Sequence, residues 1–137
     1  MRFWLLLAAA ACLRAEDPWK PLQLLMGEWV ADGGACSFDF DLERKVLIRK
    51  NYAGPHQDLT VIYVDPATKA LKAIYFDNED HVIQYAVESG PDSVRFLNQS
   101  YRLTYKKSGE NKLTLDFDIA PPGKPFASYI HAVLSRK

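Results

Sequence analysis

Apolar and polar residues alternate along most of the chain after residue 27. In residues 113–119 every second position is apolar, and Thr114, Asp116 and Asp118 lie between them. Residues 37–42 repeat this pattern. Successive side chains of a strand point to opposite faces of a sheet, so the alternation is typical of half-buried antiparallel strands. No window after residue 27 keeps a helical period for a dozen residues, and the sequence therefore predicts an all-β domain.

Short segments rich in Gly, Pro, Asn and Asp separate the alternating stretches and are typical of tight turns. The strands that we expect lie near residues 27–32, 35–41, 45–52, 58–65, 69–77, 81–89, 92–98, 100–107, 112–119 and 126–136. A flat open sheet of so many short strands would leave long unpaired edges, which closure removes. We therefore expect an antiparallel up-and-down β-barrel of about ten strands. A sandwich with Greek-key crossings is the alternative, although it would need longer connections.

The N-terminal residues 1–15 have the layout of a secretory signal peptide. Arg2 precedes an apolar run that is too short to span a bilayer as a permanent helix. The run ends in a sequence that also resembles a bacterial lipobox, in which Cys12 would be acylated. We expect a secreted or periplasmic protein whose residues 16–137 form one domain, with a lipid-anchored lipoprotein or a buried N-terminal segment as alternatives. The Pro-bounded residues 18–26 predict one or two helical turns before the first strand.

The composition agrees with a folded domain and argues against a nucleic-acid partner. Apolar residues make up 48% of the chain and charged residues 25%, which is typical of a globular protein. Basic and acidic residues balance at 17 each, and removal of residues 1–15 would leave a net charge of about −2. Nucleic-acid-binding domains normally carry a basic excess. Cys36, inside a strand pattern, is expected to be a small buried side chain.

Residues that would carry catalysis or bind a metal are sparse. The histidines His56, His81 and His131 show no metal-ligand spacing, and the chain has neither a nucleophile elbow nor a phosphate-binding loop. Residues 77–81 concentrate oxygen ligands, but they fit a solvated hairpin turn better than a calcium loop. His56 and Asp58 could act together as a base, although nothing near them in the sequence supplies a nucleophile or an oxyanion hole. We expect no enzymatic activity and no metal.

Gly27 and Trp29 lie at the start of the first expected strand, and Arg136 lies at the end of the last one. In this the chain resembles the calycin superfamily, which includes the lipocalins and the fatty-acid-binding proteins. In that superfamily a G-x-W on the first strand and a basic residue near the C-terminus pack together at the closed end of a barrel. The resemblance implies that the Arg136 guanidinium stacks over the Trp29 indole. It covers most of residues 22–137, and bacterial calycin-like domains of unknown function are the most similar group.

The end of the chain, residues 125–136, is also similar to the nitrobindins, a subgroup that binds haem through a histidine on the last strand. With the endings aligned, Tyr129 occupies the position of that histidine. His131 follows two residues later, and we expect it on the same face of the strand. The Gly-rich first strand of nitrobindins matches poorly here, and a lone strand histidine is more often a hydrogen-bonded residue than a ligand. Haem on His131 or Tyr129 is therefore an alternative to a barrel without a cofactor.

A closed barrel of this size either fills its interior with side chains or holds one small ligand. The alternation predicts that the following residues point inward: Trp29, Phe38, Phe40, Leu71, Ala73, Tyr75, Ile83, Tyr85, Val87, Val94, Phe96, Leu113, Leu115, Phe117 and Ile119. Tyr63 shares a face with Leu59 and Val61. We expect Tyr63, Tyr75, Tyr85 and Phe117 to contact a ligand, because a buried tyrosine hydroxyl needs a partner and can orient a polar group.

The orientation of Arg102 is left open by the pattern of residues 100–107. Either Tyr101, Leu103 and Tyr105 face inward, or Arg102 and Thr104 do. An inward Arg102 would bind an anionic head group or a carboxylate, whereas an outward Arg102 would pair across the sheet.

The expected function is non-catalytic binding of a small apolar or amphipathic molecule by a monomer. A solid barrel that serves as a protein-interaction module is the alternative. Contact with a membrane is expected only if Cys12 is lipidated.

Overall fold

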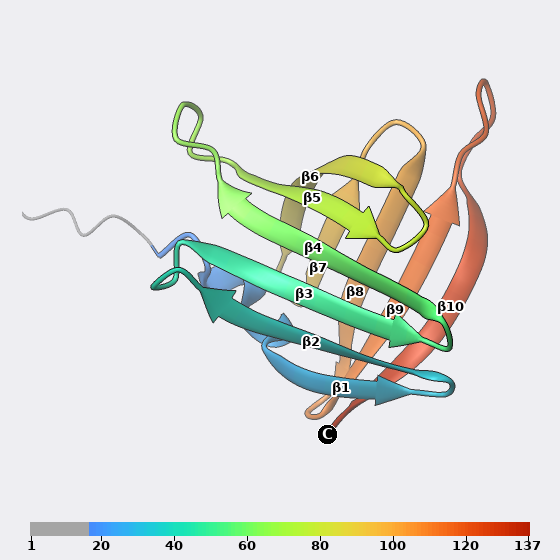
Figure 1. The fold of residues 1–137 in the computed structure, drawn as a ribbon, viewed down its shortest axis with the longest axis horizontal. Coiled ribbons are helices and arrows are strands. Elements are labelled where there is room, and N and C mark those ends of the chain that lie inside the picture. Colours follow the sequence, from blue (N-terminus) through green and yellow to red (C-terminus); the bar gives the residue numbers. More distant parts are fainter. Residues whose placement is uncertain (1–16) are drawn as a thin grey trace, which may run out of the picture.

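Ten antiparallel strands close into one barrel, and the all-β prediction is confirmed (Figure 1). The computed structural model describes residues 17–137, so the expected signal peptide and the acylation of Cys12 lie outside the described residues. The strands are β1 (Gly27–Ala31), β2 (Gly34–Asp41), β3 (Val46–Ala53), β4 (His56–Val64), β5 (Leu71–Asp77), β6 (Val82–Gly90), β7 (Ser93–Leu97), β8 (Tyr101–Gly109), β9 (Lys112–Ile119) and β10 (Ala127–Arg136). Each strand pairs with its neighbour in sequence, and β10 returns to pair with β1 (Figure 1).

A short 3-10 helix, η1 (Lys20–Leu25), precedes β1, as residues 18–26 predict. Its Leu22 and Leu25 are buried, and the helix contacts β6 and β7. The helix therefore covers the end of the barrel at which β1 begins. Within residues 17–137 no helix has the length and apolar character that a membrane span requires.

The interior of the barrel contains the residues that the alternation predicts. The predicted residues that are buried are Trp29, Phe38, Ala73, Tyr85, Val94, Phe96 and Leu113. Those that pack against this core are Phe40, Leu71, Tyr75, Ile83, Val87 and Leu115. Cys36 is buried and forms no disulfide within the described residues, in agreement with its predicted role as a small core side chain.

The barrel closes where β1 meets β10, and Trp29 lies directly opposite Arg136 there. The guanidinium carbon of Arg136 lies 4.3 Å from the centre of the Trp29 ring, so the expected stack is confirmed. Arg136 Nη1 also donates a hydrogen bond of 2.7 Å to the carbonyl of Met26. Gly27 adopts a φ of 110°, and a Cβ atom at this position would lie 2.7 Å from Arg136 Nη1. The backbone conformation therefore favours glycine at position 27, and any larger residue would also have to displace the arginine side chain from its present position.

Candidate ligand-binding cavity

A cavity of about 640 Å³ occupies the half of the barrel that is remote from η1. Its lining includes residues of the β1–β2, β3–β4 and β5–β6 hairpins, which lie at the opposite end from the start of β1. Ligand pockets in proteins typically enclose about 300–1,000 Å³. The cavity is therefore large enough for one small organic molecule.

One wall of the cavity is apolar and aromatic and comes from β8, β9 and β10. Its residues are Tyr101, Leu103, Leu115, Phe117, Ile119, Ile130, Ala132 and Leu134. The rings of Tyr101 and Phe117 are stacked, with their centroids 5.9 Å apart. Tyr129 packs edge-on against Phe117 at the same centroid distance. This wall offers apolar surface from which a ligand would exclude water.

The opposite wall is polar and is built around Arg49 of β3. The Arg49 side chain is almost completely buried, and its Nε donates a hydrogen bond of 2.7 Å to the Tyr105 hydroxyl. Its Nη1 pairs with the carboxylate of Asp58 on β4, which also accepts a bond of 2.9 Å from Asn51 Nδ2. Burial alone would lower the pKa of Arg49, but Tyr105 and Asp58 outweigh burial and raise it. Arg49 therefore carries a permanent positive charge inside the barrel.

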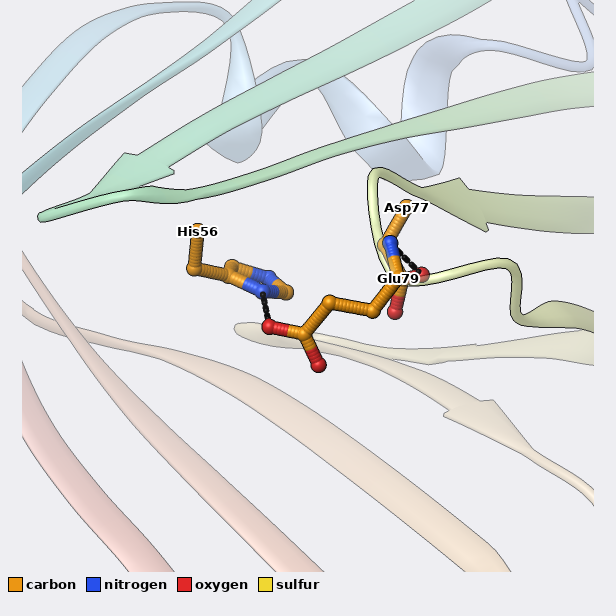
Figure 2. Close-up of side chains that lie close together, drawn as sticks. All are labelled: His56, Asp77 and Glu79. Carbon is orange, nitrogen blue, oxygen red and sulfur yellow. Dashed lines mark hydrogen bonds and ion pairs between the residues drawn. The ribbon is translucent and has the colours of Figure 1, made fainter.

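His56, at the start of β4, extends this polar network to the mouth of the cavity. Its Nε2 lies 2.8 Å from Asp58 Oδ2. Its Nδ1 lies 3.6 Å from Glu79 Oε1, and Figure 2 shows this pair. Partial burial opposes protonation of the ring, but the hydrogen bond with Asp58, assisted by Glu79, raises the pKa of His56. The imidazole thus links a buried carboxylate with an exposed one.

Asp77, at the end of β5, is the centre of a second hydrogen-bonded group at the mouth. It accepts a hydrogen bond of 2.9 Å from the Tyr75 hydroxyl, and His81 Nδ1 lies 2.8 Å from the same oxygen. Its other oxygen accepts hydrogen bonds from the backbone N–H groups of Glu79 and His81. Desolvation would raise the pKa of Asp77, but these backbone and side-chain donors hold it well below its usual range. The β5–β6 turn is therefore organised around an ionised carboxylate.

One group of side chains in residues 17–137 has the spacing of a metal site (Figure 2). It consists of His56, Asp77 and Glu79, whose possible ligand atoms all lie within 4.8 Å of one another. A histidine with two carboxylates is a donor set that transition-metal ions accept. Both oxygens of Asp77 already take part in hydrogen bonds, so a metal ion would have to compete with Tyr75 and His81 for them.

Three of the four aromatic residues predicted to contact a ligand line the cavity: Tyr75, Tyr85 and Phe117. Tyr63 does not. The buried residues of β4 are Asp58, Thr60 and Ile62, so Tyr63 and its neighbours of the same parity lie on the outer face. The expectation for Tyr63 is therefore wrong, because both faces of this strand carry apolar residues and the register of the β3–β4 hairpin decides between them.

Arg102 faces outward, so of the two orientations that the sequence leaves open, the inward one, in which Arg102 would bind a ligand, is wrong. Its Nε donates a hydrogen bond of 3.1 Å to Asp118 on β9, and its guanidinium lies 4.4 Å from the ring centre of Phe126. Tyr101 and Leu103 line the cavity instead. Two partners on the outer surface satisfy the guanidinium, whereas inside the barrel it would face the apolar wall.

The expectation that His131 shares a face with Tyr129 is wrong because β10 contains a bulge. The register shifts between Ser128 and Ile130, and this extra residue breaks the alternation. Tyr129 and Ile130 are both exposed but border the cavity, whereas His131 does not line it and its Nδ1 lies 2.6 Å from Asp116. His131 is therefore directed away from any ligand in the cavity.

The alternation of apolar and polar positions does not predict that the polar residues Arg49, Asp58 and Thr60 are buried. A usable signal is present at the turn of the β3–β4 hairpin, where Ala53 pairs with His56. This register sets Asn51 opposite Asp58 and Arg49 opposite Thr60. Two charged residues of opposite sign thus fall on one face of adjacent strands, and this arrangement favours an ion pair.

No protein-family model and no curated protein matches this chain. The fold and the cavity together define the class of protein to which it belongs. It is a closed antiparallel ten-stranded barrel whose cavity has one apolar wall and one wall of hydrogen-bonded charged groups.

Proposed function

We propose that the protein is a non-catalytic binding protein that encloses one small apolar or amphipathic molecule. The observation that carries this proposal is the division of the cavity lining. An apolar body would lie against Phe117 and its neighbours, and a polar end would lie against the wall around Arg49.

The energetics of enclosure are adequate for such a role. Each CH₂ group removed from water contributes about 0.8 kcal/mol. Burial of a chain of about ten carbons would therefore contribute roughly 8 kcal/mol, before the costs of association are subtracted. This is close to the binding free energy of a micromolar complex.

The Trp29–Arg136 stack agrees with the arrangement that the resemblance to the calycin superfamily implies, and it supports a calycin-like assignment. We further propose that the protein acts as a monomer in a secreted or periplasmic location. The cavity favours ligand binding over the alternative of a solid protein-interaction barrel, because about 640 Å³ of the interior is not filled by side chains.

The test uses the neutral dye Nile red, whose fluorescence rises in an apolar site. Wild-type protein should bind the dye and release it when decanol is added. Ala132→Phe and Leu103→Phe, which place extra volume inside the cavity, should weaken dye binding about tenfold or more.

Arg102→Ala is the matched control, because Arg102 lies on the outer face and its loss should leave dye binding unchanged. Circular dichroism verifies that each variant is folded. A folded wild-type protein that neither binds the dye nor carries a small molecule in native mass spectrometry would contradict the proposal.

A further inference from the structure

The hydroxyl of Tyr85 opens onto the cavity without a hydrogen-bond partner. The Tyr85 side chain belongs to the core, with 6% of the residue exposed, and it lines the cavity. Within residues 17–137 no fully enclosed side-chain nitrogen or oxygen lacks a partner. The unpartnered Tyr85 hydroxyl must therefore reach the open space of the cavity. Burial, reinforced by Tyr101, raises the pKa of Tyr85, so the group remains a neutral hydrogen-bond donor.

Arg49 adds further unused donors to the same part of the cavity. A guanidinium has five N–H groups. In Arg49 the Nε donates to Tyr105 and the Nη1 donates to Asp58, whereas the Nη2 has no partner among the described residues. By the same reasoning as for Tyr85, the Nη2 group is open to the cavity.

Both groups lie about halfway along their strands. Nearer the η1 end of the barrel, Leu47 and Phe96 are buried and do not line the cavity, so Tyr85 and Arg49 belong to its inner end. The carboxylates of Asp77 and Glu79 lie at the mouth, on the β5–β6 turn. A ligand that satisfies Tyr85 and Arg49 must therefore place a hydrogen-bond acceptor at its buried end and its apolar body along the β8–β10 wall.

The charge of the lining determines what kind of acceptor is favoured. The charged residues of the lining are one arginine and two histidines against four carboxylates, those of Asp32, Asp58, Asp77 and Glu79. The lining is thus net negative even when both histidines are protonated. Arg49 is already neutralised by Asp58, so an anionic head group would enter an enclosure with no uncompensated positive charge.

We propose that the cavity selects neutral, oxygen-bearing apolar molecules, such as long-chain ketones or alcohols, whose oxygen accepts hydrogen bonds from Tyr85 and Arg49. Fatty-acid anions of the same length are excluded. This inference rests on the proposed function and names the class of ligand for the same cavity.

The test compares ligands that share one chain length and differ in the head group. Displacement of Nile red from the full chain is titrated with 2-decanone, decanol, decanoate and decylamine at about pH 8. We expect the ketone and the alcohol to bind about tenfold more tightly than decanoate. They should also bind more tightly than decylamine, because an ammonium group cannot accept a hydrogen bond from Tyr85 or Arg49.

Tyr85→Phe removes the donor and keeps the ring. This variant should weaken binding of the ketone about 3- to 10-fold. The dye affinity of the variant is measured first and used to convert its displacement curves, because the carbonyl of Nile red can accept the same hydrogen bond. Tyr63→Phe, on the outer face, is the matched control and should bind all four ligands as wild type does.

Equal or tighter binding of decanoate or decylamine would overturn the inference and leave the proposed function standing. The same holds if Tyr85→Phe binds the ketone as tightly as wild type. Failure of Nile red and of all four ligands to bind would instead refute the proposed function itself.

Discussion

Arg49 and Asp58 form an ion pair inside the barrel, from adjacent strands, with less than a tenth of either side chain exposed. Asp58 accepts further hydrogen bonds from Asn51 and contacts His56. Arg49 in turn donates to Tyr105 across the interior. The pair therefore ties the polar wall of the cavity to the core.

Removing one member of this pair should be far more damaging than replacing both. Asp58→Asn leaves the Arg49 charge without its counter-ion and should lower the free energy of unfolding by about 3–5 kcal/mol. The double variant Arg49→Met/Asp58→Leu removes both buried charges and should recover at least half of that loss. Urea unfolding followed by tryptophan fluorescence measures both values. A stability of Asp58→Asn within about 0.5 kcal/mol of wild type would show that the pair is not buried as described.

The closing stack predicts coupling between Gly27 and Arg136. Gly27→Ala should destabilise the barrel by about 2 kcal/mol, because its φ of 110° is unfavourable for alanine and the added Cβ meets the guanidinium. Arg136→Met should lower stability by about 1–2 kcal/mol through loss of the stack and of the bond to Met26. The double variant should lose less than the two single losses combined, because methionine removes the group with which the Cβ collides. Additive losses in thermal unfolding would argue against this contact.

His56 should make part of the stability depend on pH. Its pKa is raised in the folded barrel, so the folded state binds the proton more tightly than the unfolded chain. This contribution is fully present below the unfolded value of about 6.5 and is lost as the pH rises through the folded pKa. The stability difference between wild type and His56→Gln should therefore be largest near pH 5 and smaller near pH 9. A difference that grows with pH in urea unfolding would reverse the assigned direction.

Tyr75 and Tyr63 offer a matched pair for the organisation of the mouth. Tyr75→Phe removes a donor from the nearly buried carboxylate of Asp77 and should lower stability by about 0.5–1.5 kcal/mol. Tyr63→Phe makes the same chemical change on the outer face and should stay within about 0.5 kcal/mol of wild type. Denaturant unfolding of the two variants side by side gives the comparison. Equal effects would mean that the Tyr75 hydroxyl does not support the β5–β6 turn.

The sequence predicts the barrel well because strict alternation leaves one choice of inward face. In β9, Leu113 and Leu115 alternate with Thr114 and Asp116, and the structure places the leucines inside. In β4, Leu59, Val61 and Tyr63 suggested one inward face, whereas Asp58, Thr60 and Ile62 form the actual one. Burial of a charged residue is favourable only when a partner lies opposite it, and that partner depends on hairpin register.

Local irregularities account for the remaining errors at the site. The bulge in β10 places Tyr129 on the cavity side out of alternation, so His131 two residues later lies on the opposite face, and no period-two pattern contains that information. Arg102 alternates with the inward-facing Tyr101 and Leu103 of β8, and its outward guanidinium contacts Asp118 and Phe126 on neighbouring segments. Distant pairings of this kind exist only once the sheet has formed.

The seam between β1 and β10 has a consequence for the kinetics of folding. Every other strand pairing joins neighbours in sequence through a short turn, whereas the bond from Arg136 to Met26 spans 110 residues. Closing so long a loop is entropically expensive, and contacts of this separation slow folding. We therefore expect the nine local strand pairings to form first. The pairing of β1 with β10, together with the Trp29–Arg136 stack, should form last and close a sheet that is already curved.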